Sequence, residues 1–183
     1  MLAISLMTLA IIAPAEPMTI TPEVLAKLHA IAFQAARTGD AKTLKEYFTL
    51  NVDVNKKNER GDTLLVVAAY NGQPEMVELI LVQPKLDVDG RNGMGLTALT
   101  AAVFKGDEAC TKLLIDAKAD FNFSNKAGRT SLMFAAVGGR AKTAKLLLDA
   151  GADANAKDHA GNTALSLAKT QGADDVVKLL EGK

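Results

Sequence analysis

The sequence lacks tryptophan, and only 4% of its 183 residues are aromatic, although 49% are hydrophobic. A chain of this length can bury a sizeable core. That core must therefore be built from alanine, leucine and valine, which suit the close packing of helices. The length favours one domain or one short array of repeats, and it argues against two separate enzyme domains.

Net charge is also absent, because 21 lysine and arginine residues balance 21 aspartate and glutamate residues. Without a global positive field, the chain has no long-range attraction for nucleic acid or for an anionic membrane. We therefore expect no nucleic acid partner, and no membrane contact once the chain is processed.

Cysteine and histidine are scarce. Cys110 is the single cysteine, so an internal disulfide is excluded. We expect it to be a small buried hydrophobic residue, because it occupies an apolar column. His29 and His159 are the two histidines, which leaves little material for a zinc site. No phosphate-binding glycine motif is present either, so we predict a protein that is not an enzyme, with no catalytic residue, metal or cofactor.

Charge is missing altogether from the first fifteen residues, MLAISLMTLAIIAPA. The apolar run is too short to span a bilayer, and Ala13-Pro14-Ala15 resembles a signal-peptide cleavage site. We interpret residues 1–15 as a signal peptide and 16–23 as a linker, which predicts a periplasmic or secreted protein of bacterial type. The alternative is a start at Met18, which predicts a cytoplasmic protein.

Glycine is arranged on two lattices that share one period. The first consists of Gly39, Gly72, Gly106, Gly139 and Gly172, and the second consists of Gly61, Gly95, Gly128 and Gly161. Every step on either lattice is 33 or 34 residues. Each glycine of the second lattice is followed after two residues by Thr63, Thr97, Thr130 or Thr163, and after four by Leu65, Leu99, Leu132 or Leu165. A fixed period of this length indicates a repeat protein.

One repeat predicts two helices. Threonine before a run of helix formers is a helix-start signal, and the first-lattice glycine ends that helix in a left-handed conformation. A second helix then carries leucines three and four apart, which bury against adjacent repeats. Residues 151–158 form a turn-rich segment that predicts an outward hairpin. The whole is an all-α solenoid of about five helix-turn-helix units with β-hairpin-like connections.

These columns resemble the ankyrin repeat family, most strongly over residues 127–155. The family's proline and histidine in the first helix are replaced in every repeat, so we expect somewhat weaker repeats. The recurrent Asp53, Asp87, Asp120 and Asp153 fit a turn position better than a calcium ladder, for which neighbouring oxygen ligands are missing. The resemblance implies a repeat domain over 24–183, divided into a cap at 24–57, repeats at 58–91, 92–124 and 125–157, and a C-terminal cap repeat at 158–183.

The resemblance also implies a protein-binding wall built from the first helices and the hairpin tips. The expected contact positions on the helices are Arg37, Tyr70, Asn71, Phe104, Lys105 and Val137, and those on the tips are Met94, Leu96 and Arg129. Tyr70 and Phe104 would be apolar anchors within a polar rim. The alternative is that Tyr70, Phe104 and Val137 pack together over the alanines beneath them.

We therefore expect a non-enzymatic monomer that binds another protein through its concave face. Two alternatives remain open. The chain could be a self-associating structural array, or an exported protein that protects or inhibits one dedicated partner.

Overall fold

The structure is a computed structural model that describes residues 21–182. The expected signal peptide and residues 16–20 of the expected linker lie outside the described residues. Within residues 21–182 the chain forms ten α-helices and no β-strand. The first helices of the five units are α1 (Pro22–Thr38), α3 (Leu64–Tyr70), α5 (Ala98–Lys105), α7 (Ser131–Val137) and α9 (Ala164–Gln171). The second helices are α2 (Ala41–Phe48), α4 (Pro74–Leu81), α6 (Glu108–Asp116), α8 (Ala141–Asp149) and α10 (Asp174–Glu181).

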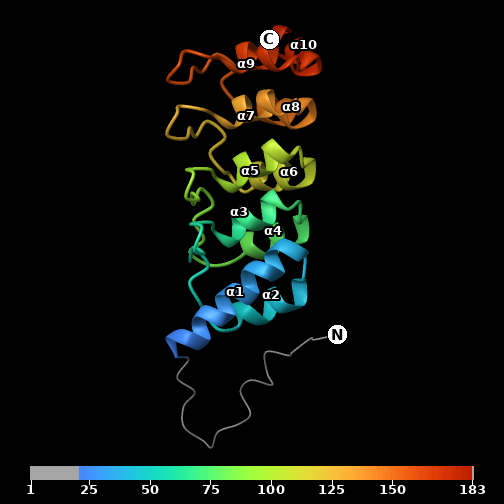
Figure 1. Cartoon of the computed structure of the whole chain (residues 1–183). Coiled ribbons are helices and arrows are strands. Elements are labelled where there is room, and N and C mark those ends of the chain that lie inside the picture. Colours follow the sequence, from blue (N-terminus) through green and yellow to red (C-terminus); the bar gives the residue numbers. More distant parts are fainter. Residues whose placement is uncertain (1–20, 183) are drawn as a thin grey trace, which may run out of the picture.

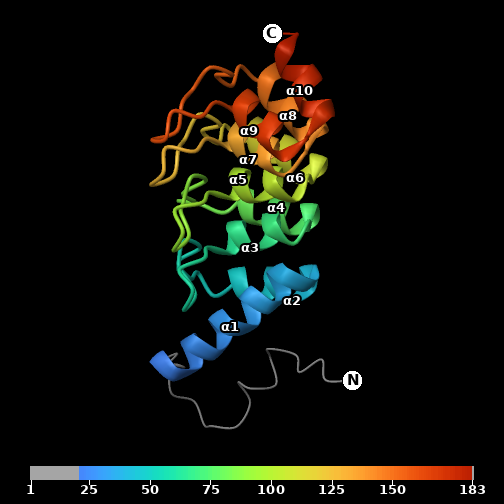
Figure 2. The same cartoon turned by 45° about the horizontal axis from the view of Figure 1, so that its top comes forward.

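The five helix pairs stack into an elongated array. The first helices form one column, the second helices form a parallel column, and the connections project to one side (Figures 1 and 2). Each first helix packs on the first helices of the adjoining units, and each second helix does the same in its own column. This arrangement confirms the expected all-α solenoid. No helix of the described segment has the length and apolar character needed to cross a membrane.

Threonine starts the first helix in units two to five. The hydroxyl groups of Thr63, Thr97, Thr130 and Thr163 accept hydrogen bonds from backbone N–H groups in the first turn, at 3.2–3.4 Å. Each such cap stabilises its helix by about 1 kcal/mol. The cap therefore supplies the helix start that proline at the next position would otherwise favour. The cap helix α1 begins at Pro22 with Thr21 as its N-cap, slightly before the expected domain start at residue 24.

Two units have hydroxyl side chains where the family has histidine. The Thr100 hydroxyl lies 3.1 Å from that of Thr97 and 3.0 Å from that of Ser131 in the next unit. In the last unit, the Ser166 hydroxyl accepts a hydrogen bond from the backbone N–H of Thr163. These bonds partly replace the threonine–histidine hydrogen bonds that the family has in the first helix.

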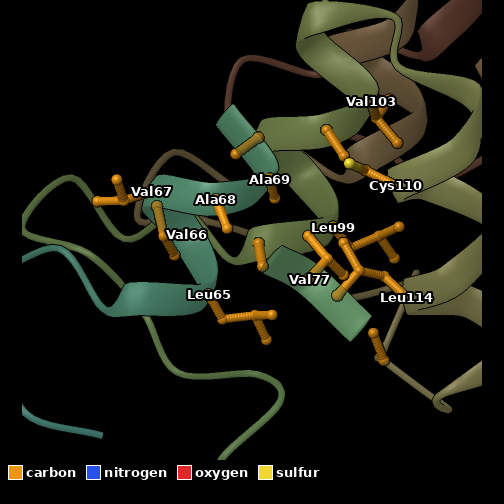
Figure 3. Close-up of a cluster of buried hydrophobic side chains, with 14 of the residues drawn as sticks. Leu65, Val66, Val67, Ala68, Ala69, Val77, Leu99, Val103, Cys110 and Leu114 are labelled. Carbon is orange, nitrogen blue, oxygen red and sulfur yellow. The ribbon is translucent and has the colours of Figure 1, made fainter. Parts of the chain in front are cut away.

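The core is continuous along the array and is built from small aliphatic residues. Figure 3 shows Val77 of α4, Leu99 of α5 and Leu114 of α6 gathered together, with Leu65 of α3 in the same buried cluster. Cys110 is fully buried beside them, and burial raises the pKa of its thiol to about 12. The thiol therefore stays protonated at neutral pH, which confirms Cys110 as a buried hydrophobic residue.

A ladder of hydrogen bonds joins the connections of successive units. The side-chain Oδ1 atoms of Asn55, Asp89 and Asn122 accept the backbone N–H groups of Asp87, Asp120 and Asp153, at 2.8, 3.0 and 3.1 Å. The recurrent aspartates also bond within their own turns, because each accepts the N–H group two residues later. The aspartate column thus occupies a turn position, as the sequence predicts.

The connections end in tips that one side chain closes. The Oδ1 atom of Asn58, Asn92, Asn125 or Asp158 accepts two backbone N–H groups of its own tip, at 2.8–3.0 Å. The same residue donates its backbone N–H to the carbonyl oxygen four residues later. Between residues 21 and 182 the pairing of strands is limited to one isolated bridge, Ser124 to Thr130. The hairpins are therefore side-chain-closed turns.

Candidate protein-binding surface

Aromatic side chains line up along three consecutive first helices. Tyr70 ends α3 with 47% of its surface exposed, and Phe104 lies in the last turn of α5 with 39% exposed. The Phe104 ring meets the half-buried Phe134 ring of α7 edge to face, with centroids 6.4 Å apart. The Lys105 ammonium lies 5.0 Å from the centroid of the Tyr70 ring, a cation–π contact. We call Tyr70, Phe104, Lys105 and Phe134 the aromatic strip.

Hydrogen bonds from the next unit hold the strip in place. Arg140 Nε donates to the carbonyl oxygen of Phe104 at 3.1 Å, and the Thr143 hydroxyl donates to that of Val103 at 3.3 Å. Both carbonyls lie in the last turn of α5, and that of Val103 also accepts the Gly106 backbone N–H at 3.0 Å. The backbone beneath Phe104 is therefore fixed by α8, and the ring is presented on a rigid support.

The other helix residues that were predicted to contact a partner differ in how exposed their side chains are. Val137 is half-buried and packs against the core. Asn71 uses its amide to donate to the Val67 carbonyl at the end of α3. Arg37 is exposed and bonds Gln34 within α1. Tyr70 and Phe104 therefore offer the larger apolar surface, and Arg37 borders them at the cap.

The predicted tip residues form a separate group. Met94 is 70% exposed at the second tip, while Leu96 is half-buried at its base. Arg129 lies at the third tip, where its Nε is 3.5 Å from the Oδ2 of Asp158 in the fourth. Arg129 thus links two tips, so part of its donor capacity is already used within the chain.

Sequence reasoning missed three residues of this surface. Phe134 lies one helical turn before Val137 on the same face of α7, and a search restricted to the expected contact column passes over it. The guanidinium carbon of Arg91 lies 4.1 Å from the centroid of the Phe123 ring. This contact joins two units, so only the stacking of the repeats reveals it.

The two histidines and the cysteine lie on separate elements of the array. His29 lies on α1 against the buried Tyr47 ring, and burial lowers its pKa. His159 is exposed at the last tip, and Cys110 is buried in α6. In the part of the chain that the structure describes, no three histidine, cysteine, aspartate or glutamate residues are placed to hold a metal ion.

Comparisons with known proteins identify the repeats. A sequence profile of ankyrin repeats (three copies) matches residues 32–125 and 99–182. The curated protein "Putative glutaminase 2" of Caenorhabditis elegans is 32% identical over 72 residues, which are 39% of this chain and 12% of that protein. The matched stretch is about an eighth of the relative, and it carries no glutaminase activity to this chain. Since the profile matches cover most of the sequence, the chain belongs to the ankyrin repeat family.

Proposed function

We propose that this chain binds a protein partner through the aromatic strip, without catalysing a reaction. Ankyrin repeats generally act as protein–protein interaction modules. The observation that carries the proposal is the exposure of Tyr70 and Phe104, at 47% and 39%, on consecutive first helices. Large aromatic side chains at the centre of an interface commonly supply much of the binding energy.

The support beneath the strip favours binding at low entropic cost. Phe134 and Lys105 already restrict the two anchor rings, and α8 fixes the end of α5. Side chains that are ordered before binding lose less conformational freedom when a partner arrives. The strip is bordered by Arg37 and Asn71, which are exposed polar residues suited to a rim.

The experiment compares wild type with the double variant Tyr70→Ala and Phe104→Ala as baits on a native extract. Val82→Ala is the matched control, because Val82 is 76% exposed at the end of α4, in the column of second helices. Circular dichroism first establishes that all three proteins are folded. A retained protein is identified by mass spectrometry, purified, and its affinity for each bait is measured.

We expect the double variant to weaken that affinity at least about tenfold, because losing two aromatic anchors costs about 2 kcal/mol or more. Val82→Ala should leave it unchanged. Equal binding by all three proteins would overturn the proposal. If wild type retains nothing and its mass in solution rises with concentration, the self-associating alternative replaces it.

A further inference from the structure

A small pocket lies between the second and third tips, outside the aromatic strip. Its volume is about 260 Å³, and its lining is Arg91, Asn92, Gly93, Gly95, Phe123, Ser124, Asn125 and Lys126. The lining residues include two cations and no carboxylate. The lining therefore favours a ligand that carries negative charge.

Arg91 lies against an aromatic ring at this pocket. Its guanidinium group is stacked on the Phe123 ring at 4.1 Å. Within residues 21–182 it takes part in no ion pair, and neither does Lys126. A stacked guanidinium keeps its N–H edges available, and their fork geometry matches the two oxygens of a carboxylate.

At the next junction between tips, polar groups are paired within the chain. Between the third and fourth tips, the His159 backbone N–H donates to the Ala127 carbonyl at 2.9 Å, and Arg129 pairs with Asp158. Lys126 occupies the position of His159 one repeat earlier. Its backbone N–H has no partner among the described residues, and neither has the Ser124 hydroxyl. The pocket thus offers the Lys126 N–H group, whose counterpart at the neighbouring junction is used internally, together with the Ser124 hydroxyl.

The charge of the tips extends this preference beyond the pocket. The four tip segments 56–62, 90–96, 123–129 and 156–162 hold seven lysines and arginines against three aspartates and glutamates, although the whole chain is neutral. The aspartates of the adjoining connections also carry negative charge, but their oxygens accept backbone N–H groups, whose partial positive charge offsets part of it. The tips therefore favour an acidic partner segment.

We propose that this pocket receives an aspartate or glutamate side chain of the protein partner, with its carboxylate on Arg91. The proposal rests on the proposed function, because it names the chemistry of that partner. Met94, 70% exposed beside the pocket, suits an apolar residue next to the acid. Nucleic acid is disfavoured because the chain as a whole carries no net positive charge.

The test is a titration of the ¹⁵N-labelled full chain with hexaglutamate, followed by the amide signals of Gly93, Ser124 and Lys126. Hexaglutamine, inorganic phosphate and a single-stranded oligonucleotide are the comparison ligands. Three variants are titrated as well. Arg91→Gln removes the charge, and Arg91→Lys keeps the charge without the planar fork. Lys157→Gln makes the same charge change at the corresponding position of the last tip.

We expect hexaglutamate to shift these amides saturably and hexaglutamine to leave them unchanged. Arg91→Gln should weaken the binding at least about tenfold, Arg91→Lys several-fold, and Lys157→Gln less than about twofold. Equal losses in Arg91→Gln and Lys157→Gln would show a diffuse field and overturn the proposal. Phosphate or the oligonucleotide binding the same amides as tightly as hexaglutamate, or amide shifts confined to other residues, would overturn it too.

The results distinguish a failure of this proposal from a failure of the proposed function. Tyr70→Ala with Phe104→Ala should leave hexaglutamate binding unchanged, because the strip contributes nothing to the pocket. If that variant loses the captured partner while hexaglutamate leaves the pocket amides unshifted in wild type, only the carboxylate site is wrong. If hexaglutamate binds at Arg91 while wild type and the double variant hold the partner equally, only the strip is wrong.

Discussion

At the scale of single residues, one tip differs from the others. Asn58, Asn92 and Asn125 close three tips, whereas Asp158 closes the fourth. Hydrogen bonds from the backbone and side chain of Asn162 hold the pKa of Asp158 below its ordinary value, with smaller help from Ala160 and Arg129 and against the effect of burial. The carboxylate form is therefore favoured by folding.

This preference predicts a dependence of stability on pH. A depressed pKa contributes stability that is present above the unfolded value of about 4 and is lost as pH falls through the folded value. The urea midpoint of the wild type should thus fall below about pH 4. Asp158→Asn should have a lower midpoint than wild type at pH 7, and a smaller loss on acidification.

The comparison of the two proteins isolates Asp158. Asp40 also has a lowered pKa, because the side chain and backbone of Thr43 donate to it, but it is the same in both. Parallel curves for wild type and Asp158→Asn from pH 7 to pH 2 would contradict the assignment.

At the scale of helices and turns, the second helices end unequally. Gly151 follows α8 with a φ of 99°, while the matching residues Asn51, Lys85 and Lys118 have φ of 50°, 60° and 66°. A left-handed conformation costs a residue with a Cβ about 1–2 kcal/mol, and glycine little. Three of the four repeat junctions therefore contain backbone strain that the last one avoids.

Relieving one strained junction should stabilise the array. Lys118→Gly is expected to raise the free energy of unfolding by about 0.5–1 kcal/mol, because the greater freedom of glycine in the unfolded chain offsets part of the gain. Lys112→Gly, at an exposed position inside α6, is the matched control and should lower it by about 1 kcal/mol. Urea unfolding followed by circular dichroism measures both changes. A loss of stability in Lys118→Gly would show that the junction is not strained.

At the scale of the whole molecule, the sequence predicts the array well because each unit packs mainly on its neighbours. The glycine lattices and the threonine caps locate Thr63 to Gly72 and its counterparts as first helices. The side-chain closure of the tips, and the contact of Arg91 with Phe123, depend on how units stack in space. No pattern within the sequence of a single repeat predicts these contacts.

The candidate surface was predictable only in part. Tyr70 and Phe104 stand at positions that the repeat register places on the exposed end of first helices, and their role in binding stays a prediction. The register alone did not show that Val137 turns toward the core, that Arg129 is bonded to Asp158, or that Phe134 extends the strip. Those facts depend on the side chains of adjoining units.

The central claim is that a protein partner covers the aromatic strip, and amide hydrogen exchange of the complex tests it most directly. The partner captured by the wild type is mixed with the full chain, and exchange is compared with that of the chain alone. We predict slower exchange at the ends of α3 and α5, around Tyr70 and Phe104. Protection confined to the second helices α4, α6 and α8, with the ends of α3 and α5 unchanged, would contradict the claim.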